Sequence, residues 1–437
     1  MHVVIIGAGW AGLAAAVELS AANIRVTLVE AAKQAGGRAR RVDTQGMQFD
    51  NGQHIVLGAY REMLRLLDVI GVSEEQAFFR RALRLEMRSP RHERICIAFP
   101  ALPAPWHVAV GFARATGLSR SERYRALALC AQLFFSGFKV NNTLSVAEWL
   151  HRAKQPRRLI KALWEPLCLA ALNTPLNRAS AEIFIRILHE TFAGARGNAD
   201  MLFPRADLGA IFPEPAMQFI RRHGGTVHCG ERVTSLDIRD GRIDGVTTHQ
   251  GMIRADHVII AASSDASLRL IEPHPLLQDI SRRLTLLQHE PICTVYLQYP
   301  PEMRLGGEML GLLDGTGQWI LDLGDAGHPG RMAVVISGPG PHMSRDNAAL
   351  IKDISEEISK HFLQWPAPSH SIIIREKRAT FSCRAGIEAL RPATRTPVDG
   401  CWLAGDYTDT GLPATLEGAL RSGVRAAREI MGTNSAG

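Results

Sequence analysis

The residue pattern at the start of the chain is the strongest constraint on its fold. Residues 3–6 are apolar, the next six read Gly-Ala-Gly-Trp-Ala-Gly, and an alanine-rich stretch, 13–22, precedes a second apolar run, 24–30. This order predicts a strand, a glycine turn, a helix and a strand, a βαβ unit that is right-handed by the usual rule. The spacing G-x-G-x-x-G is that of a turn whose backbone approaches the pyrophosphate of a dinucleotide. The predicted contacts in this turn are Gly7, Gly9, Trp10, Ala11 and Gly12.

An acidic residue at the end of the second predicted strand strengthens this interpretation. Glu30 follows Gly12 by 18 residues, where a carboxylate can accept hydrogen bonds from both hydroxyls of an adenosine ribose. An acid there disfavours a 2′-phosphate, so NADP is not the expected ligand. The fingerprint serves both NAD and FAD, and a glycine turn in an unrelated βαβ unit is the alternative.

Length and composition indicate an ordinary globular enzyme. A chain of 437 residues exceeds the size of one hydrophobic core, so two regions are expected. The formal net charge of +7 fits nucleic-acid binding, an anionic membrane surface, an anionic substrate or simply a solvated surface. Seven cysteines without a CxxC pair favour free thiols in a reducing compartment and no metal site. No apolar run reaches the roughly 18 residues of a spanning helix, so we expect a chain that does not cross a membrane but can lie on one.

The rest of the pattern predicts a second region interleaved with the first. Helical spacing predicts a mostly helical insertion, with helices at 60–70, 106–114, 123–135, 146–153 and 157–172. A return to the nucleotide domain is predicted by a helix at 213–223 and strands at 226–229, 233–239, 242–248 and 255–262. Apolar segments between 293 and 337 predict a mixed or antiparallel sheet, and a strand at 401–404 leads to a helix at 414–431. We predict a nucleotide-binding domain of 1–60, 201–265 and 391–437, and a substrate domain of 61–200 and 266–390.

Three further segments carry glycines and charges that belong with the first turn. They are Gly36-Gly37-Arg38, Phe49-Asp50-Asn51-Gly52-Gln53-His54, and Gly405-Asp406-Tyr407-Thr408 with Leu416-Glu417-Gly418-Ala419-Leu420. In these segments the chain resembles the amine oxidase and phytoene desaturase superfamily of flavoproteins. The resemblance implies FAD as the cofactor and an α/β fold, in which a Rossmann-like FAD-binding domain is interleaved with an α+β substrate domain and a helical insertion.

The same resemblance implies roles for individual residues. The loop at Arg38 would lie beside the FAD phosphates, the segment 49–54 along the isoalloxazine, and Asp406 at the ribityl and pyrophosphate region. The helix that begins near Ala414 would point its positive end at the flavin N1/O2 locus. The cofactor contacts implied in this way are Gly37, Arg38, Gly52, Gln53, Val233, Gly405, Asp406, Leu416 and Glu417.

The loop before Glu417 separates subfamilies within this superfamily. Amine oxidases usually place two aromatic residues there as a cage for the substrate amine, and the corresponding positions here are Leu412 and Thr415. The missing cage counts against an amine substrate and for an apolar one. The segment 405–408 instead resembles the plant-type phytoene desaturases, which act on long isoprenoids.

A narrower resemblance rests on three places in the chain. Residues 50–54 continue into Leu-Gly-Ala-Tyr at 57–60, residues 164–168 read Trp-Glu-Pro-Leu-Cys before Ala-Leu-Asn-Thr-Pro at 171–175, and residues 204–208 read Pro-Arg-Ala-Asp-Leu before Ile-Phe-Pro at 211–213. They resemble the squalene-associated FAD-dependent desaturases, described as hydroxysqualene dehydroxylases of bacterial hopanoid synthesis. The resemblance implies reductive removal of an allylic hydroxyl, giving squalene, water and oxidised FAD.

Such a reaction requires a hydride and a proton for the leaving hydroxide. His54 is the first candidate for the proton donor; the alternative is a structural role in which backbone hydrogen bonds hold the ring. Asp50 is expected to orient His54; the alternative is a capping or turn role. Glu165 and Asn173 are expected to reach the substrate pocket, which Leu412 and Thr415 also line. For Glu165 and Asn173 the alternative is a role at the helix surface or in packing.

The substrate also predicts partners. A C30 hydrocarbon must come from a bilayer or a partner enzyme, so upstream squalene-pathway synthases and peripheral membrane contact, around 106–108 and 134–135, are expected, and nucleic acid is not. We expect a cytoplasmic protein, peripheral on the inner face of the membrane. Three alternatives stay open: an FAD-dependent isoprenoid desaturase, a flavin amine oxidase, and a prenyl-binding protein without flavin, since GDP-dissociation inhibitors share the architecture.

Overall fold

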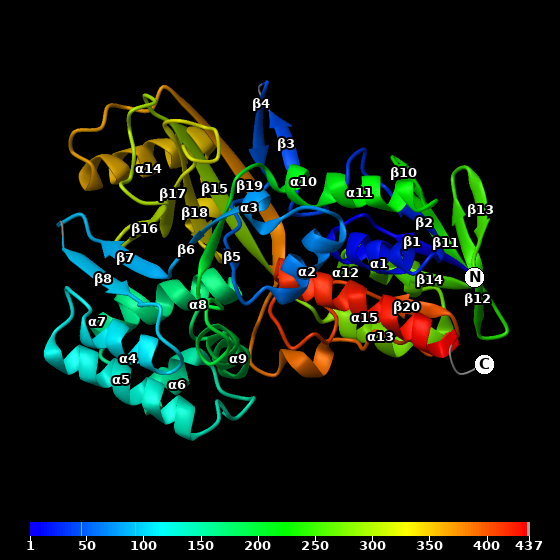
Figure 1. The fold of residues 1–437 in the computed structure, drawn as a ribbon, viewed down its shortest axis with the longest axis horizontal. Helices are drawn as coiled ribbons and strands as arrows, with labels where there is room; N and C mark the ends of the chain where they lie inside the picture. Colours follow the sequence, from blue (N-terminus) through cyan, green and yellow to red (C-terminus); the bar gives the residue numbers. More distant parts are fainter. Residues whose placement is uncertain (45, 92, 435–437) are drawn as a thin grey trace.

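A five-stranded parallel sheet forms the nucleotide-binding part of the protein (Figure 1). The computed structural model describes residues 1–44, 46–91 and 93–434. The predicted βαβ unit is confirmed as β1 (His2–Ile6), α1 (Trp10–Ala21) and β2 (Arg25–Glu30). Later segments complete the sheet in the order β10-β2-β1-β14-β20, with every pair parallel: β10 (Thr226–Cys229), β14 (His257–Ile260) and β20 (Cys401–Leu403). The sheet thus joins strands from the start, middle and end of the chain.

Helix α1 lies between this sheet and the last helix, α15 (Leu416–Asn434). Its alanines at 11 and 14–16 are buried, because both of its sides are covered. The two helices approach at backbone distance: a Cβ added to Gly423 would lie 2.0 Å from the carbonyl oxygen of Ala11. Helix α11 (Pro213–Arg222) also packs on α1. The small side chains of α1 therefore reflect its place between two layers.

A seven-stranded mixed sheet forms the second part. Its order is β19-β15-β18-β17-β16-β7-β8, and only β16 and β7 pair in parallel. The predicted mixed sheet is confirmed at β15 (His289–Gln298), β16 (Met309–Leu312), β17 (Trp319–Asp322) and β18 (Arg331–Ser337). Sequence reasoning missed the strands β7 (Arg84–Arg88), β8 (Arg94–Ala98) and β19 (His370–Phe381). In β7 apolar residues alternate with charged ones, so its sequence signal was present and overlooked, whereas the charged run 375–378 interrupts the pattern of β19.

The stretch predicted as a mostly helical insertion is helical only in part. Its helices are α2 (Arg61–Val69), α3 (Glu74–Ala77), α4 (Trp106–Ala113), α5 (Arg120–Phe135), α6 (Val146–Arg152), α7 (Arg157–Leu159), α8 (Glu165–Leu172) and α9 (Ala181–Phe192). The helix predicted at 157–172 is broken by a π-helical turn, Ile160–Trp164. Strands β7 and β8 leave this stretch to join the large sheet, so the insertion is not a separate bundle.

Two small sheets and a two-stranded ribbon complete the strands. They are β3 (Arg41–Thr44) with β4 (Met47–Asp50); β5 (Val56–Leu57), β9 (Met201–Pro204) and β6 (Phe78–Arg81); and β11 (Val233–Arg239), β12 (Arg242–Thr248) and β13 (Gly251–Arg254). The other helices are α10 (Leu208–Ile211), α12 (Ser264–Ile271), α13 (Gln278–Thr285) and α14 (Asn347–His361), with short 3-10 turns at 275–277, 341–343 and 387–390. Within the described ranges, no helix combines the length and apolar character needed to cross a bilayer.

The contact between α1 and α15 can be tested with a matched pair of glycine substitutions. Gly423→Ala forces a methyl group against the Ala11 carbonyl, so we expect the free energy of unfolding to fall by roughly 2 kcal/mol. Gly432→Ala is the control: on the same helix, nothing lies within 4 Å of the added carbon, and stability should be unchanged or slightly raised. Urea unfolding measures both, and equal stability of the two variants would contradict the close packing.

Candidate active site

A cavity of about 640 Å³ lies at the carboxyl ends of β1, β2, β14 and β20. In parallel sheets this edge is where ligands bind. The cavity gathers most of the residues singled out from the sequence, although they come from distant parts of the chain. Those lining it are Gly7, Gly9, Trp10, Ala11, Glu30, Gly37, Arg38, His54, Val233, Gly405, Asp406, Thr415 and Leu416.

The glycine turn forms the floor of this cavity because side chains do not fit there. Gly7 has a φ of +103°, and a Cβ on it would lie 2.8 Å from the Ala261 carbonyl oxygen. Gly12 does not line the cavity; a Cβ there would lie 1.9 Å from the carbonyl oxygen of Gly7. Gly9 faces Gly37, whose added Cβ would come within 3.2 Å of the Gly9 Cα. The turn therefore leaves bare backbone and the first turn of α1 facing the cavity, which suits a pyrophosphate.

The Glu30 carboxylate is held in place by backbone N–H groups. Its Oε2 accepts a hydrogen bond from the Ala8 N–H at 2.7 Å, and its Oε1 accepts one from the Ala32 N–H at 2.7 Å. Each oxygen keeps a further lone pair, and the side chain lines the cavity. This carboxylate is thus pre-oriented to accept hydrogen bonds from the hydroxyls of a ribose.

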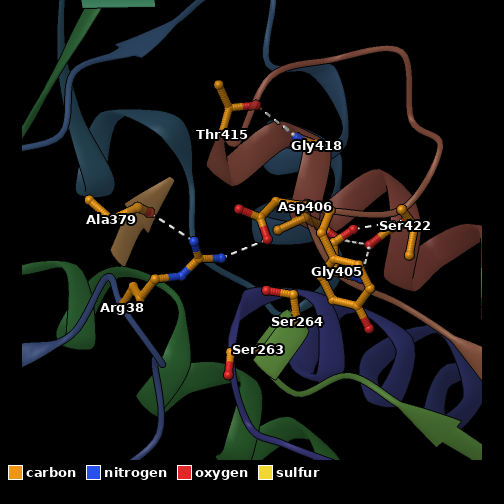
Figure 2. A network of polar contacts seen from close by, with 12 residues as sticks. Arg38, Ser263, Ser264, Ala379, Gly405, Asp406, Thr415, Gly418 and Ser422 are labelled. Atoms are coloured by element: carbon orange, nitrogen blue, oxygen red, sulfur yellow. Dashed lines mark hydrogen bonds and ion pairs between the residues drawn. The ribbon is translucent and has the colours of Figure 1, made fainter. Parts of the chain in front are cut away.

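Figure 2 shows an ion pair between Arg38 and Asp406, which both line the cavity. The Arg38 Nη2 lies 2.6 Å from Asp406 Oδ1, and its Nη1 donates to the Ala379 carbonyl oxygen at 2.7 Å. The second glycine loop, the end of β19 and the loop after β20 are joined by this one guanidinium. A cation and a nearly buried carboxylate side by side suit the phosphates and sugar hydroxyls of a dinucleotide.

The loop that carries Asp406 is fixed against α15. The Gly405 N–H donates to Ser422 Oγ at 2.8 Å, and Arg391 donates to the Asp406 carbonyl oxygen at 2.9 Å. The Thr415 hydroxyl accepts a hydrogen bond from the Gly418 N–H at 3.1 Å, at the start of α15 (Figure 2). Leu416, the first residue of α15, lines the cavity, so the N-terminus of this helix lies at the cavity wall.

His54 lies at the cavity wall with a defined tautomer. Its Nδ1 is 2.9 Å from the Gly52 carbonyl oxygen, and since a carbonyl only accepts, Nδ1 carries the hydrogen and Nε2 has the lone pair when the ring is neutral. Burial and the nearby charge of Arg38 lower the pKa of His54, although the bond to Gly52 partly offsets them. A neutral His54 accepts a hydrogen bond at Nε2. Nε2 can donate a proton only after the ring has been protonated.

The predicted partnership between Asp50 and His54 is absent. The Asp50 Oδ1 accepts a hydrogen bond from the Leu208 N–H at 2.9 Å, at the first residue of α10, which confirms the alternative capping role. Asp50 faces a second cavity of about 100 Å³, which Gln53 and Tyr296 also line. Burial raises the pKa of Asp50 to about 7.

Other predicted contacts lie away from the main cavity. Glu417 does not line it: its carboxylate accepts hydrogen bonds from the Glu62 and Met63 N–H groups, both at 3.1 Å, and so caps α2. Gly52, Gln53, Leu412, Glu165 and Asn173 are also missing from its wall.

Asn173 ends α8 in a left-handed conformation and ties the helix to the large sheet. Its Nδ2 donates to Pro291 O and Thr380 Oγ1, and its Oδ1 accepts from the Gly338 N–H at 2.7 Å. The side chain is therefore committed to packing rather than to a substrate. Glu165 opens α8 immediately after the π-helical turn and is half-buried.

Sequence reasoning missed several residues of the cavity wall. Ser263 and Ala266 follow β14, and Arg232 immediately precedes the predicted contact Val233. The carboxyl end of the predicted strand at 255–262 was a usable signal for Ser263, because loops at that edge meet the ligand. No sequence signal pointed to Ala379, because its strand, β19, was not predicted.

A glycine turn under a helix N-terminus, an oriented carboxylate at the end of β2 and the Arg38–Asp406 ion pair are together typical of a dinucleotide-binding α/β protein. A family model described as flavin containing amine oxidoreductase matches residues 10–431. The chain belongs to this flavin-containing oxidoreductase family. Its fold is accordingly the α/β fold of flavin amine oxidases.

Individual relatives agree with this assignment. The hydroxysqualene dehydroxylases of Rhodopseudomonas palustris and Zymomonas mobilis are 28% and 27% identical, over 99% and 97% of this chain and of their own length. The chloroplast 15-cis-phytoene desaturase of Arabidopsis thaliana is 24% identical over 99% of this chain and 80% of its own. Among solved structures, an oxidoreductase from Methanosarcina mazei superposes with a TM-score of 0.75 at 18% identity, over 98% of this chain and all of its own. A redesigned putrescine oxidase superposes with a TM-score of 0.72 at 17% identity, over 99% of both chains.

The role of the Glu30 carboxylate can be tested through flavin retention. Glu30→Ala removes the acceptor aimed at the ribose and leaves the Ala8 and Ala32 N–H groups without it, so we expect the flavin Kd to rise about 10- to 100-fold. Flavin absorbance after gel filtration and equilibrium titration measure the loss. Exposed Glu75, on α3, is the control as Glu75→Ala and should keep its flavin. Unchanged flavin content in Glu30→Ala would mean that the ribose lies elsewhere.

Proposed function

We propose that the protein is an FAD-dependent enzyme that reductively removes the allylic hydroxyl of hydroxysqualene to give squalene. The observation that carries the proposal is the similarity, over 97–99% of this chain and of the relatives' own length, to several curated hydroxysqualene dehydroxylases. Phytoene desaturases follow at 23–25% identity and cover less of their own length. Both groups act on long isoprenoids according to their names, which supports an apolar substrate here.

The residues of the cavity suit the parts of an FAD molecule, which supports FAD as the cofactor. Glu30 would bind the adenosine ribose, the turn at 7–12 the pyrophosphate, and Arg38 with Asp406 the phosphate and ribityl region. The N-terminus of α15 would lie at the flavin ring, where its dipole favours negative charge. We also propose the division into an FAD-binding domain, 1–60, 201–265 and 391–437, and a substrate domain, 61–200 and 266–390.

The flavin end of the cavity lacks an aromatic amine cage. Leu412 is buried away from the cavity wall, and the Thr415 hydroxyl is occupied as an acceptor for the Gly418 N–H. His54, Ala379 and Leu416 line the cavity, and the Arg38 guanidinium donates a hydrogen bond to the Ala379 carbonyl oxygen. Since neither cage position is aromatic, the chain offers no cation–π contact to an ammonium group at Leu412 or Thr415.

The net reaction joins R–OH and reduced FAD and yields R–H, water and oxidised FAD. When bound, the reduced cofactor supplies the hydride. The chain supplies the proton, because hydroxide leaves poorly, and it keeps water out of the reacting volume. His54 is the group we propose for this step: it lines the cavity, and because its Nδ1–H is fixed on Gly52, Nε2 is the nitrogen that would carry the proton.

The runner-up is an FAD-dependent isoprenoid desaturase, which oxidises a C–C bond with the same cofactor. One assay separates the two. Purified protein should convert hydroxysqualene to squalene with chemically reduced FAD, as judged by mass spectrometry, and should leave squalene unchanged with oxidised FAD. Desaturated products from squalene or phytoene would favour the runner-up. Release of hydrogen peroxide from amines would favour an amine oxidase. A protein that takes up no flavin would favour a prenyl-binding protein.

The proton donor predicts a pH profile with a defined sign. The pKa of His54 is lowered from its ordinary 6.5, so its protonated form is scarce at pH 7 and grows as the pH falls. The single-turnover rate at saturating hydroxysqualene should therefore rise as pH is lowered, with a midpoint below 6.5. His54→Phe should retain flavin and lose turnover. A midpoint near pH 7 that disappears in Asp50→Asn would move the role to Asp50, whose pKa is about 7.

A further inference from the structure

The positive charge of the chain is concentrated in one place. Residues 106–159, from the start of α4 to the end of α7, contain nine lysines and arginines and two carboxylates, whereas the rest of the sequence contains 41 basic and 41 acidic residues. We call this segment the basic lobe. In Figure 1 it lies at the opposite end of the molecule from the parallel sheet and both termini. The formal charge of +7 is thus a property of one lobe, not of the whole surface.

Both carboxylates of the basic lobe are used within its own helices. Glu122 completes a capping box with Ser119 and pairs with Arg158 at 2.9 Å. Glu148 completes the capping box of α6 with Ser145. They satisfy helix N-termini and do not form an acidic surface beside the cations. The exposed cations of the lobe are Arg114, Arg120, Lys139, Arg152, Lys154, Arg157 and Arg158.

The same lobe exposes aromatic rings. Trp106, Tyr124 and Phe135 are 64%, 67% and 92% exposed, and throughout the described ranges no other aromatic residue is among the large hydrophobic residues at the surface. Helix α5 packs inward through Leu129 and Leu133, and its outer side carries Ala128, Ala131 and Gln132 between the two exposed rings. Two alanines and one amide make this stretch less polar than the outer side of a helix that faces only water.

We propose that the basic lobe docks on an anionic lipid bilayer, with Trp106, Tyr124 and Phe135 in the interfacial layer and the lysines and arginines at the headgroups. Aromatic rings and long basic side chains are the residues that this layer favours. Anionic headgroups provide the charge that a lobe of +7 lacks. A second copy of the chain is disfavoured, because a symmetric contact would press two such lobes together. The proposal deepens the proposed function, since a C30 substrate is held in bilayers.

Vesicle flotation of the full-length protein with bound flavin tests this proposal without any substrate. We expect the protein to float with vesicles of equimolar phosphatidylcholine and phosphatidylglycerol, and to bind vesicles of phosphatidylcholine alone at least about tenfold more weakly. Binding to the anionic vesicles should weaken in 1 M salt, where the screening length is about 3 Å. Equal binding to both compositions, or none to either, would overturn the proposal.

Two triple variants locate the surface. The aromatic variant combines Trp106→Ser, Tyr124→Ser and Phe135→Ser, and the cation variant combines Arg120→Gln, Lys139→Gln and Arg152→Gln. Each should weaken binding to anionic vesicles at least about tenfold. The matched control replaces three leucines exposed elsewhere: Leu276→Ser, Leu286→Ser and Leu363→Ser, which are 52%, 55% and 76% exposed in the parent chain. The control should bind like the parent protein. Flavin content and unfolding temperature show whether each variant is folded.

The remaining outcomes each decide the question. If the control loses as much binding as the aromatic variant, general surface apolarity explains the binding and the basic lobe is not the docking site. If light scattering shows a dimer that the aromatic variant abolishes, and vesicles are not bound, the lobe is a contact between copies. Vesicle binding that persists in a protein unable to convert hydroxysqualene in detergent would refute the proposed function and leave the docking surface standing.

Discussion

The close packing of α1 between the parallel sheet and α15 is the contact on which the rest of the structure depends. At Gly12 the helix meets the carbonyl of Gly7, and at Gly423 the last helix meets the carbonyl of Ala11, at distances no side chain allows. Backbone therefore lies on backbone across three layers, and residues from both ends of the chain reach one cavity. If α15 were displaced, the loop of Asp406 would move with it, because Ser422 on that helix holds Gly405.

Within the cavity, charged groups are fixed before any ligand arrives. Glu30 is held by two N–H groups, and Arg38 is held between Asp406 and the Ala379 carbonyl. Such pre-orientation lowers the cost of binding a rigid, highly charged cofactor. The carboxylates of Asp50 and Glu417 instead cap other helices and contribute no charge to the cavity. The cavity wall thus has two charged regions, the Glu30 carboxylate at the end of β2 and the Arg38–Asp406 ion pair beside His54.

Charge is divided on a larger scale as well. The described residues outside the basic lobe form the sheets and the cofactor cavity from a nearly balanced set of acids and bases, and the lobe carries the excess. Four of the residues predicted for the site, Asp50, Asn173, Glu165 and Glu417, carry polar groups that belong to neither region of the cavity wall. For three of them, hydrogen bonds to helix ends or the large sheet explain why these residue types stand there.

The sequence by itself determined the βαβ unit, the glycine turn, Glu30 and the contribution of the C-terminal segment to the cofactor site, because these depend on local spacing and on residue types with few substitutes. It also indicated most of the helices, whose apolar periodicity is local. Only the tertiary structure decided which side chains face the cavity: Glu417 and Asp50 look like ligands in the chain, but nearby helix N-termini take up their oxygens. The placement of strands β7 and β19 in the large sheet was likewise decided by pairing, since β7 pairs with β16 and β19 with β15, which are distant in the sequence.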